Sequence, residues 1–285
     1  MEREPLLDPG MGIAPRSESL VRCVDHHRSS GGHARFSGKE DQIQYAAAAR
    51  APNRFEVKYL VPTVHVPGLI EEFSPYLKRD PNARAPGGYR VLSVYWDTPA
   101  HLFFWEKVEG VKRRRKLRFR RYDSMGPIHV EVKQREDRTL QKRRFAWDAD
   151  MVQAAFGDVG WGVGWEAVGD DPVAREVAVM IERLKLQPTI AVQYRRRALV
   201  GRYDPSFRLT FDGRIQYAPA PLDLLRGFDV GRYIVDPRVT VMEVKYDHRV
   251  SSWLGRTISR HGLQMVRMSK YCSAVDRHYY DAAHT

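Results

Sequence analysis

The sequence predicts an α+β protein built on a largely antiparallel sheet. Three observations lead to this prediction. Segments in which apolar and charged residues alternate recur along most of the chain, as is typical of strands with one buried face. Most of these segments follow one another through short connections rather than long crossovers. Helical patterns occur only between groups of strands and at the end of the chain, which favours an α+β fold.

The strands can be placed in order along the chain. The first is RFEVKYLV, in which Phe55, Val57 and Tyr59 face one way while Glu56 and Lys58 face the other. Seven further segments have strand character, and they cover residues 89–98, 116–123, 127–137, 139–148, 189–203, 207–217 and 239–247. Together they predict a meander of antiparallel strands.

Helices are predicted at residues 66–80, 170–188, 251–263 and 269–281. The first of these is expected to be broken by Pro75. The second has complete boundary signals, because Asp171 can cap it, Pro172 occupies its first turn and Pro188 ends it.

The chain divides into a tail and one domain. Residues 1–53 are rich in Ser, Gly, Arg, His and Pro and have little periodicity, so we expect a disordered N-terminal tail. Residues 54–281 carry the strands and helices and are expected to form the folded domain. Within it, GDVGWGVG at residues 157–164 is predicted to be a glycine-rich loop.

The charge of the protein indicates a polyanionic partner. Lys and Arg number 47 against 35 Asp and Glu, which gives a net charge of +12 over 285 residues. Nucleic acid, an acidic membrane surface and phosphate-rich small molecules all fit such a surplus, as does an ordinary solvated basic surface. The 43% of hydrophobic residues are enough for a sizeable core.

Cysteine content and hydropathy indicate a cytoplasmic protein. Cys23 and Cys272 are far apart and lack metal-ligand spacing, so neither a disulfide framework nor a zinc site is predicted. No apolar run approaches the ~20 residues of a membrane helix. The first residues lack the apolar segment of a signal peptide.

Five of the predicted strands share one charged face. Residues two apart on a strand point to the same side, and the pairs are Glu56 and Lys58, Arg118 and Arg120, Glu131 and Lys133, Arg208 and Asp212, and Glu243 and Lys245. The charges could simply face water. Alternatively the sheet could close into a barrel with the charges inside and helices outside, where a polyanion would pair with them. Arginines on consecutive strands favour the second arrangement, because Arg suits bidentate phosphate binding.

The ordered set of short motifs resembles the VTC domain, the polyphosphate-polymerase branch of the triphosphate tunnel metalloenzymes in the CYTH-like superfamily. The matching stretches are RFEVKYLV, SVYWDTP, KLRFRRYD, HVEVKQRED, QKRRF, VQYRRRALV, RLTFDGRI, VMEVKYD and MSKY, spread over residues 54 to about 275. The resemblance implies an antiparallel β-barrel tunnel with a charged lumen that grips a triphosphate, and helices packed outside. Leu117 and Phe119 would then lie outside, and the arginines between and beside them would lie in the lumen.

The resemblance also implies a set of site residues. The predicted catalytic cations are Lys58, Arg118, Arg120, Lys133, Lys142, Arg196 and Lys270, and the predicted substrate-binding residues are Tyr194, Lys245 and Ser269. Mn²⁺ or Mg²⁺ is the implied cofactor. Glu243 matches the metal-binding glutamate of the family, and Glu56 and Glu131 are further metal candidates.

Several of these roles have an alternative. The assignment of Lys142 could shift by one among its basic neighbours. Tyr194 could belong to the core, because Val192 and Ala198 share its face. Glu56, Glu131 and Asp212 could pair with neighbouring cations instead of a metal. Ser269 could cap a helix, and Asp97 is expected to fix a turn or pair with an arginine.

The first strand departs from the wider superfamily. Many CYTH members open with Glu-x-Glu-x-Lys, whereas FEVKYL has Lys58 in the place of the second glutamate. A missing carboxylate weakens a hydrolase interpretation, since hydrolysis needs a water activated by metal and carboxylate. The resemblance therefore implies a phosphotransferase that passes the γ-phosphate of a nucleoside triphosphate, ATP above all, to growing polyphosphate.

Three other functions stay open at this point: a metal-dependent tripolyphosphatase or nucleoside triphosphatase, a non-catalytic polyphosphate-binding module, and a nucleic-acid binder. The run KRRRKLRFRR suggests the last, but it has few stacking aromatics and matches no common nucleic-acid fold. The glycine-rich loop lacks the Gly-Lys-Ser/Thr of a phosphate-binding loop. Family relatives work beside membrane proteins, so a membrane protein partner is a further expectation.

Overall fold

The computed structural model describes residues 55–280, apart from residues 82, 84–86, 124–125, 138, 149–170, 221–228, 230 and 248. The predicted tail at residues 1–53 and the predicted glycine-rich loop at residues 157–164 lie outside this part. Among the described helices, none combines the length and the apolarity that a membrane-crossing helix requires.

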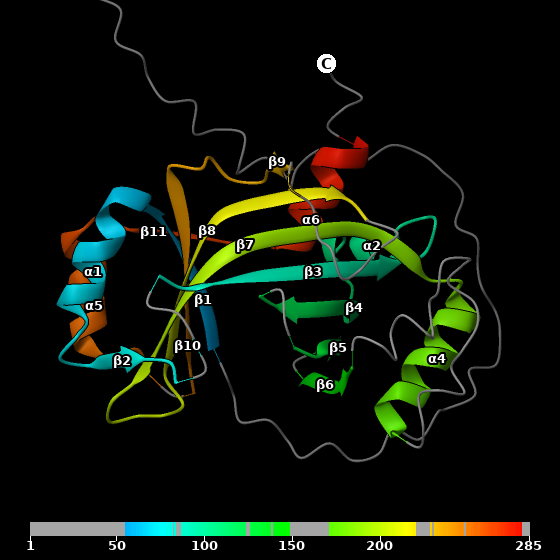
Figure 1. Ribbon diagram of the computed structural model, residues 1–285, viewed down its shortest axis with the longest axis horizontal. Helices are drawn as coiled ribbons and strands as arrows, with labels where there is room; N and C mark the ends of the chain where they lie inside the picture. The colour runs from blue at the N-terminus through cyan, green and yellow to red at the C-terminus, as the bar shows by residue number, and fades with distance from the viewer. Residues whose placement is uncertain are drawn as a thin grey trace, which may run out of the picture. The chain divides into compact units, whose positions relative to one another are not determined.

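An antiparallel sheet of eleven strands forms the framework (Figure 1). The strand order is β11-β1-β10-β8-β7-β3-β4-β5-β6, with β2 added to β7 and β9 added to β8. The strands are β1 (Phe55–Pro62), β2 (Leu77–Arg79), β3 (Tyr89–Asp97), β4 (Arg113–Tyr122), β5 (Ile128–Glu136), β6 (Thr139–Trp147), β7 (Gln187–Gly201), β8 (Arg208–Pro219), β9 (Arg232–Tyr233), β10 (Val239–Tyr246) and β11 (Gln264–Val266). The predicted α+β class with a large antiparallel sheet is confirmed.

The helices lie between strands and at the end of the described chain; the helix at residues 102–108 was not predicted, and residues 77–79 of the predicted helix at 66–80 form a strand. They are the 3-10 turn η2 (Thr63–His65), α1 (Val66–Glu72), α2 (Leu102–Val108), α4 (Pro172–Leu184), α5 (Ser252–Arg260), α6 (Lys270–Val275) and the π-helical turn η4 (Asp276–Tyr280). The predicted cap of α4 is confirmed, because the Asp171 carboxylate accepts hydrogen bonds from the backbone N–H groups of Val173 and Ala174. Helix α1 ends at Glu72, before Pro75, and β2 follows it.

The described strands do not show the predicted closed barrel. Strands β6 and β11 stand at the two ends of the strand order, and no pairing joins them in the described part of the chain. The sheet is nevertheless curved. Strands β5 and β1 are far apart in the strand order, yet Lys133 on β5 lies close enough to Glu56 on β1 for its charge to lower the pKa of the Glu56 carboxyl.

The two faces of the sheet differ in chemistry. The convex face is apolar and lies under helices: Leu117 and Phe119 of β4 pack in one core with Val177 of α4, and Tyr59 and Met242 pack in a second core together with α1 and α5. Figure 1 shows α4 at one end of the sheet and the α1–α5 pair at the other. The predicted outward orientation of Leu117 and Phe119 is confirmed.

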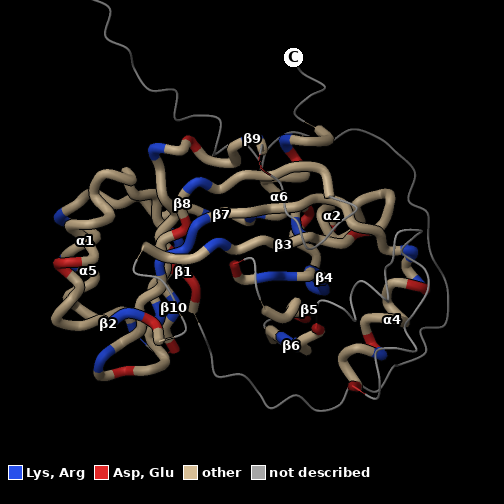
Figure 2. Tube along the Cα trace, in the orientation of Figure 1, with Lys and Arg blue, Asp and Glu red and all other residues tan. Residues whose placement is uncertain are grey.

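The opposite side, called the concave face below, carries the charged residues. In Figure 2, acidic and basic positions are interspersed where β7 and β8 pass β1 and β10. Part of the concave face is apolar and is covered by α6, whose Tyr271 stacks on Tyr95 of β3 at 4.9 Å between ring centroids. The N-terminal end of α6 is thereby held against the charged part.

Asp97 fixes the chain between β3 and α2. Its buried carboxylate accepts hydrogen bonds from the backbone N–H groups of Thr98, Phe103 and Phe104 at 2.7, 2.8 and 3.0 Å, and another from the Tyr271 hydroxyl. The expected role in fixing a turn is confirmed. These contacts do not support the alternative pairing with an arginine, because the partners are backbone N–H groups and a tyrosine hydroxyl. Because Tyr271 belongs to α6, this carboxylate also ties α6 to the sheet.

Removal of the Asp97 carboxylate should destabilise the protein. Asp97→Ala removes the acceptor of two buried N–H groups, of the half-buried Thr98 N–H and of the buried Tyr271 hydroxyl, so we expect the free energy of unfolding to fall by about 3 kcal/mol. Asp97→Asn, which keeps one acceptor oxygen, should lose less. Urea unfolding followed by circular dichroism measures the change, with Asp236→Ala in an exposed turn as the control. An unchanged midpoint for Asp97→Ala would contradict this role.

Candidate functional site

The register of the sheet brings the predicted site residues onto the concave face. On β4, Arg118 and Arg120 point to this face because they alternate with the outward Leu117 and Phe119. Arg118 is directly opposite Glu131 of β5, and Glu131 is opposite Arg144 of β6. Strands β4, β5 and β6 therefore form one charged wall, and β1, β10 and β8 form another.

Glu131 is the centre of the wall formed by β4, β5 and β6. Its carboxylate, 2% exposed, lies 2.6 Å from Nε of Arg118 and 2.9 Å from Nζ of Lys142, with Nη1 of Arg120 at 3.8 Å. Burial alone would raise the pKa of Glu131, but these three cations outweigh it and hold the pKa far below its ordinary value. Arg118 and Arg120 are thus held in fixed positions around an ionised carboxylate.

The two arginines have further supports from β3. Nη1 of Arg118 donates to the Tyr95 hydroxyl at 3.4 Å, and Nε of Arg120 donates to Oγ of Ser93 at 2.9 Å. Sequence reasoning did not single out Ser93 and Tyr95 as site residues. The signal was present, since Ser93, Tyr95 and Asp97 alternate in SVYWD and share the face of the arginines.

Asp212 organises part of the opposite wall. Its fully buried carboxylate accepts two parallel hydrogen bonds from Arg196, at 2.6 and 2.7 Å, and one from Nζ of Lys270 at 2.6 Å. The Arg196 guanidinium and the Lys270 ammonium also lie over the ring of Tyr194, at 5.2 and 4.8 Å from its centroid. Tyr194 is therefore both part of the core and a support for two predicted phosphate-binding cations.

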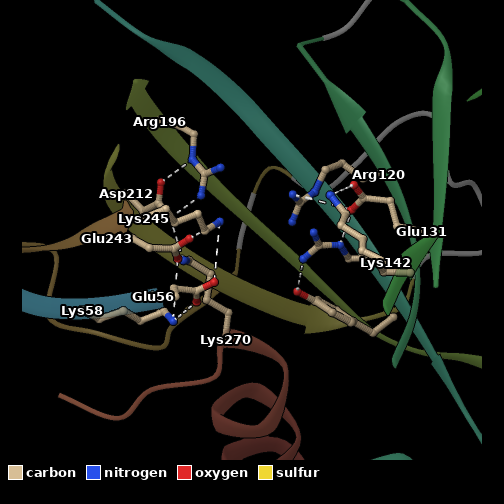
Figure 3. Close-up of polar contacts among 12 residues, drawn as sticks. Glu56, Lys58, Arg120, Glu131, Lys142, Arg196, Asp212, Glu243, Lys245 and Lys270 are labelled. Carbon is tan, nitrogen blue, oxygen red and sulfur yellow. Dashed lines mark hydrogen bonds and ion pairs between the residues drawn. The ribbon is translucent and has the colours of Figure 1, made fainter. Parts of the chain in front are cut away.

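Glu243 and Glu56 pair with the lysines beside them. Oε1 of Glu243 lies 2.6 Å from Nζ of Lys245, and Oε2 lies 3.8 Å from Nζ of Lys58. Glu56 contacts Lys58 and lies 3.7 Å from Nζ of Lys245. Burial would raise the pKa of Glu243, but Lys245, Lys270 and Lys58 hold it well below its ordinary value. Figure 3 shows this group together with the pair of Arg196 and Asp212, and the group around Glu131 as a separate cluster.

Lys133 has a different environment from the other cations. It remains accessible to water, yet it lies among Lys116, Lys245 and Arg118. Loss of hydration lowers the pKa of its ammonium to about 8, and the neighbouring positive charges add to this effect against the opposing influence of Glu56. A polyanion on the concave face would relieve this repulsion.

Ser269 and Lys116 connect α6 to β4. Oγ of Ser269 accepts a hydrogen bond from the backbone N–H of Cys272 at 3.3 Å, which makes it the N-cap of α6, and another from Nζ of Lys116 at 2.8 Å. The capping alternative for Ser269 is supported by these contacts. Its hydroxyl also lies on the concave face beside a lysine, so its predicted contact with phosphate stays a prediction.

All thirteen predicted site residues thus lie on or border the concave face. Eight of them are cations and three are carboxylates, and Asp212 supplies a fourth carboxylate. Each carboxylate is paired with cations, so the pairing alternative for Glu56, Glu131 and Asp212 is supported. The surplus of cations leaves the concave face able to bind a polyanion.

The carboxylates of the concave face are the type of ligand that a divalent metal ion prefers. Mg²⁺ and Mn²⁺ prefer oxygen ligands, and Mg²⁺ is often held by one or two carboxylates together with substrate phosphates. Within the described ranges, no three His, Cys, Asp or Glu side chains converge to form a complete metal site. Glu243, with Glu56 on the adjacent strand, could hold an ion whose remaining ligands are phosphate oxygens and water.

The fold and the site define a class of protein. The antiparallel sheet and the paired arginines, lysines and carboxylates on its concave face are features that the resemblance to the VTC domain implied. A family model described as the VTC domain matches residues 53–279, and the chain belongs to this family. A comparison with curated proteins gave no match.

Solved structures of low sequence identity resemble the chain. One is a Hippeastrum protein assigned as an adenylyl cyclase and described as having a dominant triphosphatase activity; it is 14% identical, with 79% of this chain and 94% of that one covered and a TM-score of 0.47. Another is a Bacillus halodurans protein assigned as an adenylate cyclase, 11% identical, with 80% and 99% covered and a TM-score of 0.45. At these scores the likenesses carry no argument, and membership rests on the family match.

The lowered pKa of Lys133 predicts that tripolyphosphate binding depends on pH. Its pKa of about 8 lies below the ordinary 10.5, so the free side chain loses its charge as the pH rises through 8. A bound polyanion favours the charged form, so binding near this pH should take up a proton and should weaken as the pH rises further.

Calorimetry in buffers of different ionisation enthalpy measures the proton uptake. Lys133→Arg, which stays charged throughout, should reduce the uptake and flatten the pH dependence. Comparison with this variant removes the contribution of the ligand's own ionisation. If the variant takes up as many protons as the unmodified protein, the altered pKa is not that of Lys133.

Proposed function

We propose that the concave face transfers the γ-phosphate of a nucleoside triphosphate, ATP above all, to a growing polyphosphate chain. The observation that carries this proposal is that the site carboxylates are held in their ionised form. The pKa values of Glu56, Glu131, Asp212 and Glu243 are all lowered by the cations that surround them. A carboxylate held so firmly in its ionised form is a weak base, and a hydrolase would need a base to activate water.

A phosphate acceptor avoids this requirement. The terminal oxygens of polyphosphate are already ionised, so one of them can attack the γ-phosphorus without losing a proton. As the new P–O bond forms, the bond between the γ-phosphorus and the bridging oxygen breaks, and the electron pair leaves on the diphosphate product. The protein then contributes position and charge neutralisation, which dominate phosphoryl transfer.

The cations of the two walls have distinct places in this scheme. Arg118, Arg120, Lys133 and Arg196 bind the oxygens of the triphosphate, exchanging part of their contact with Glu131 and Asp212 for contact with phosphate. Lys58, Lys142 and Lys270 guide the acceptor, with Lys245 beside Glu243. A divalent ion held by Glu243 would supply neutralisation of phosphate charge.

Two alternatives make different predictions for the same assay. A tripolyphosphatase or nucleoside triphosphatase would release only orthophosphate from ATP. A polyphosphate-binding module would bind chains and leave ATP intact. We also propose that a partner protein at a membrane receives the polymer.

Purified protein mixed with ATP and Mn²⁺ or Mg²⁺ should form polymer longer than the donor's own triphosphate, visible on a polyacrylamide gel. Arg118→Gln should lower the rate on the order of 100- to 1,000-fold, because each preorganised charge at the transferred phosphate contributes on this scale. Arg238→Gln, in an exposed pair with Asp236, should leave the rate unchanged.

Stability needs a separate control, because Arg118→Gln leaves the buried Glu131 with fewer cations. The double variant Arg118→Gln with Glu131→Gln removes both charges and should fold while still failing to make polymer. Release of orthophosphate without polymer would overturn the transferase proposal in favour of a hydrolase. Intact ATP with tight polyphosphate binding would favour the binding module.

A further inference from the structure

The chemistry of the concave face changes steadily along β4 and β5. Starting from the end of β4, the side chains that share this face are Tyr122, Arg120, Arg118, Lys116 and Arg114. The residues opposite the last four of these on β5 are His129, Glu131, Lys133 and Arg135. One end of this strip is therefore aromatic, the middle holds the arginines around Glu131, and the other end is cationic.

The aromatic end lies next to Arg120. The ring centroids of Tyr122 and His129 are 5.4 Å apart, and Tyr89 packs on Tyr122 at 5.9 Å. Tyr122 and His129 are both half-buried, and the Arg120 guanidinium lies over the Tyr122 ring at 5.9 Å from its centroid. Aromatic faces stack with nucleobases of any sequence.

The cationic end has like charges in directly opposed positions. Lys116 faces Lys133, and Lys133 faces Lys142 on the next strand. One step further along, Arg114 faces Arg135. Like charges opposite each other destabilise a sheet, so these rows cost stability unless an anion lies over them.

On the other wall opposite charges meet across β1 and β10, where Glu56 faces Lys245 and Lys58 faces Glu243. Lys245 also faces Arg208 of β8, but each of these two cations is paired with a carboxylate, Glu243 and Asp80 respectively. The rows of like charge on β4 and β5 lie at the end of the strip away from Tyr122.

We propose that the concave face binds its nucleotide in one direction, with the nucleobase against Tyr122 and His129 and the phosphates running toward Arg114 and Arg135. This inference rests on the proposed function and adds the orientation of both substrates. In-line transfer places the acceptor opposite the leaving diphosphate. The acceptor chain therefore approaches along Lys116 and Lys142, and the lengthening polymer extends past Arg114 and Arg135.

Among the described residues, the reverse orientation has no comparable place for the base. The aromatic ring beside Lys116 is that of Tyr271, which is 2% exposed and stacked on Tyr95. In this part of the chain a nucleobase at that end would face cations, and the charged phosphates would face the aromatic pair.

Binding measurements without turnover test the orientation. The probes are a non-hydrolysable ATP analogue, tripolyphosphate and long-chain polyphosphate. The double variant Tyr122→Ala with His129→Ala should weaken binding of the ATP analogue about tenfold, the lower part of what base stacking contributes, and should change tripolyphosphate binding less than about twofold. Tyr122→Phe keeps the ring and should bind the analogue normally.

The cationic end is tested by Arg114→Gln with Arg135→Gln. This variant should weaken binding of long-chain polyphosphate at least about tenfold at low salt and change binding of the ATP analogue less than about twofold. Arg113→Gln is the matched control, since Arg113 alternates with Arg114 on the same strand and points to the other face.

Two results would overturn the orientation. One is an equal loss of affinity for the ATP analogue and for tripolyphosphate in the Tyr122→Ala, His129→Ala variant, which would show that the two rings act on phosphate binding or on folding. The other is a loss of affinity for the ATP analogue as large as the loss for polyphosphate in the Arg114→Gln, Arg135→Gln variant. Because these are binding data, they stand apart from the polymer assay: absence of polymer with the predicted binding pattern would refute the transferase and keep the orientation.

Discussion

The pairing of buried carboxylates with cations on the concave face is the interaction on which the rest of the site depends. Arginines and lysines on neighbouring strands repel one another, and a sheet with this many of them on one face would be strained. Glu131 and Asp212 prevent this by holding Arg118, Lys142, Arg196 and Lys270 in fixed positions. The same contacts preorganise the cations for phosphate, so that binding exchanges one anion for another with little rearrangement.

The pairing of opposite charges differs between the two walls of the concave face. This difference gives the concave face two distinct ends, and so a direction for a bound nucleotide. Along β1 and β10 each cation has a carboxylate opposite it, whereas on β4 and β5 the rows beyond Glu131 oppose like charges, Lys116 to Lys133 and Arg114 to Arg135. The balanced wall, which carries Glu243 and Glu56, fits a metal ion beside the bound triphosphate. The unbalanced rows fit an anion that has no fixed length, and the aromatic pair at the far end fits the one part of the nucleotide that carries no charge.

Sequence alternation was enough to predict most of the sheet and the sharing of one face by Lys58, Arg118, Glu131 and Glu243. Alternation could not say which face was covered; that depended on α4 and on the α1–α5 pair, whose packing against Leu117 and Tyr59 is a tertiary contact. Closure was predicted and is not seen, because it depends on pairing between the ends of the sheet. Strands β2, β9 and β11 are too short for a periodic signal, and the role of Asp97 depends on Tyr271, 174 residues away.

A crystal structure with tripolyphosphate and Mn²⁺ would distinguish a phosphate-binding role of the paired charges from a purely structural one. We expect phosphate oxygens within hydrogen-bond distance of Arg118, Arg120 and Arg196, with Glu243 on the metal and the sheet otherwise unchanged. Tripolyphosphate bound away from the concave face, with the contacts between Arg118 and Glu131 and between Arg196 and Asp212 intact, would contradict it. In that case the paired charges would serve the stability of the sheet alone.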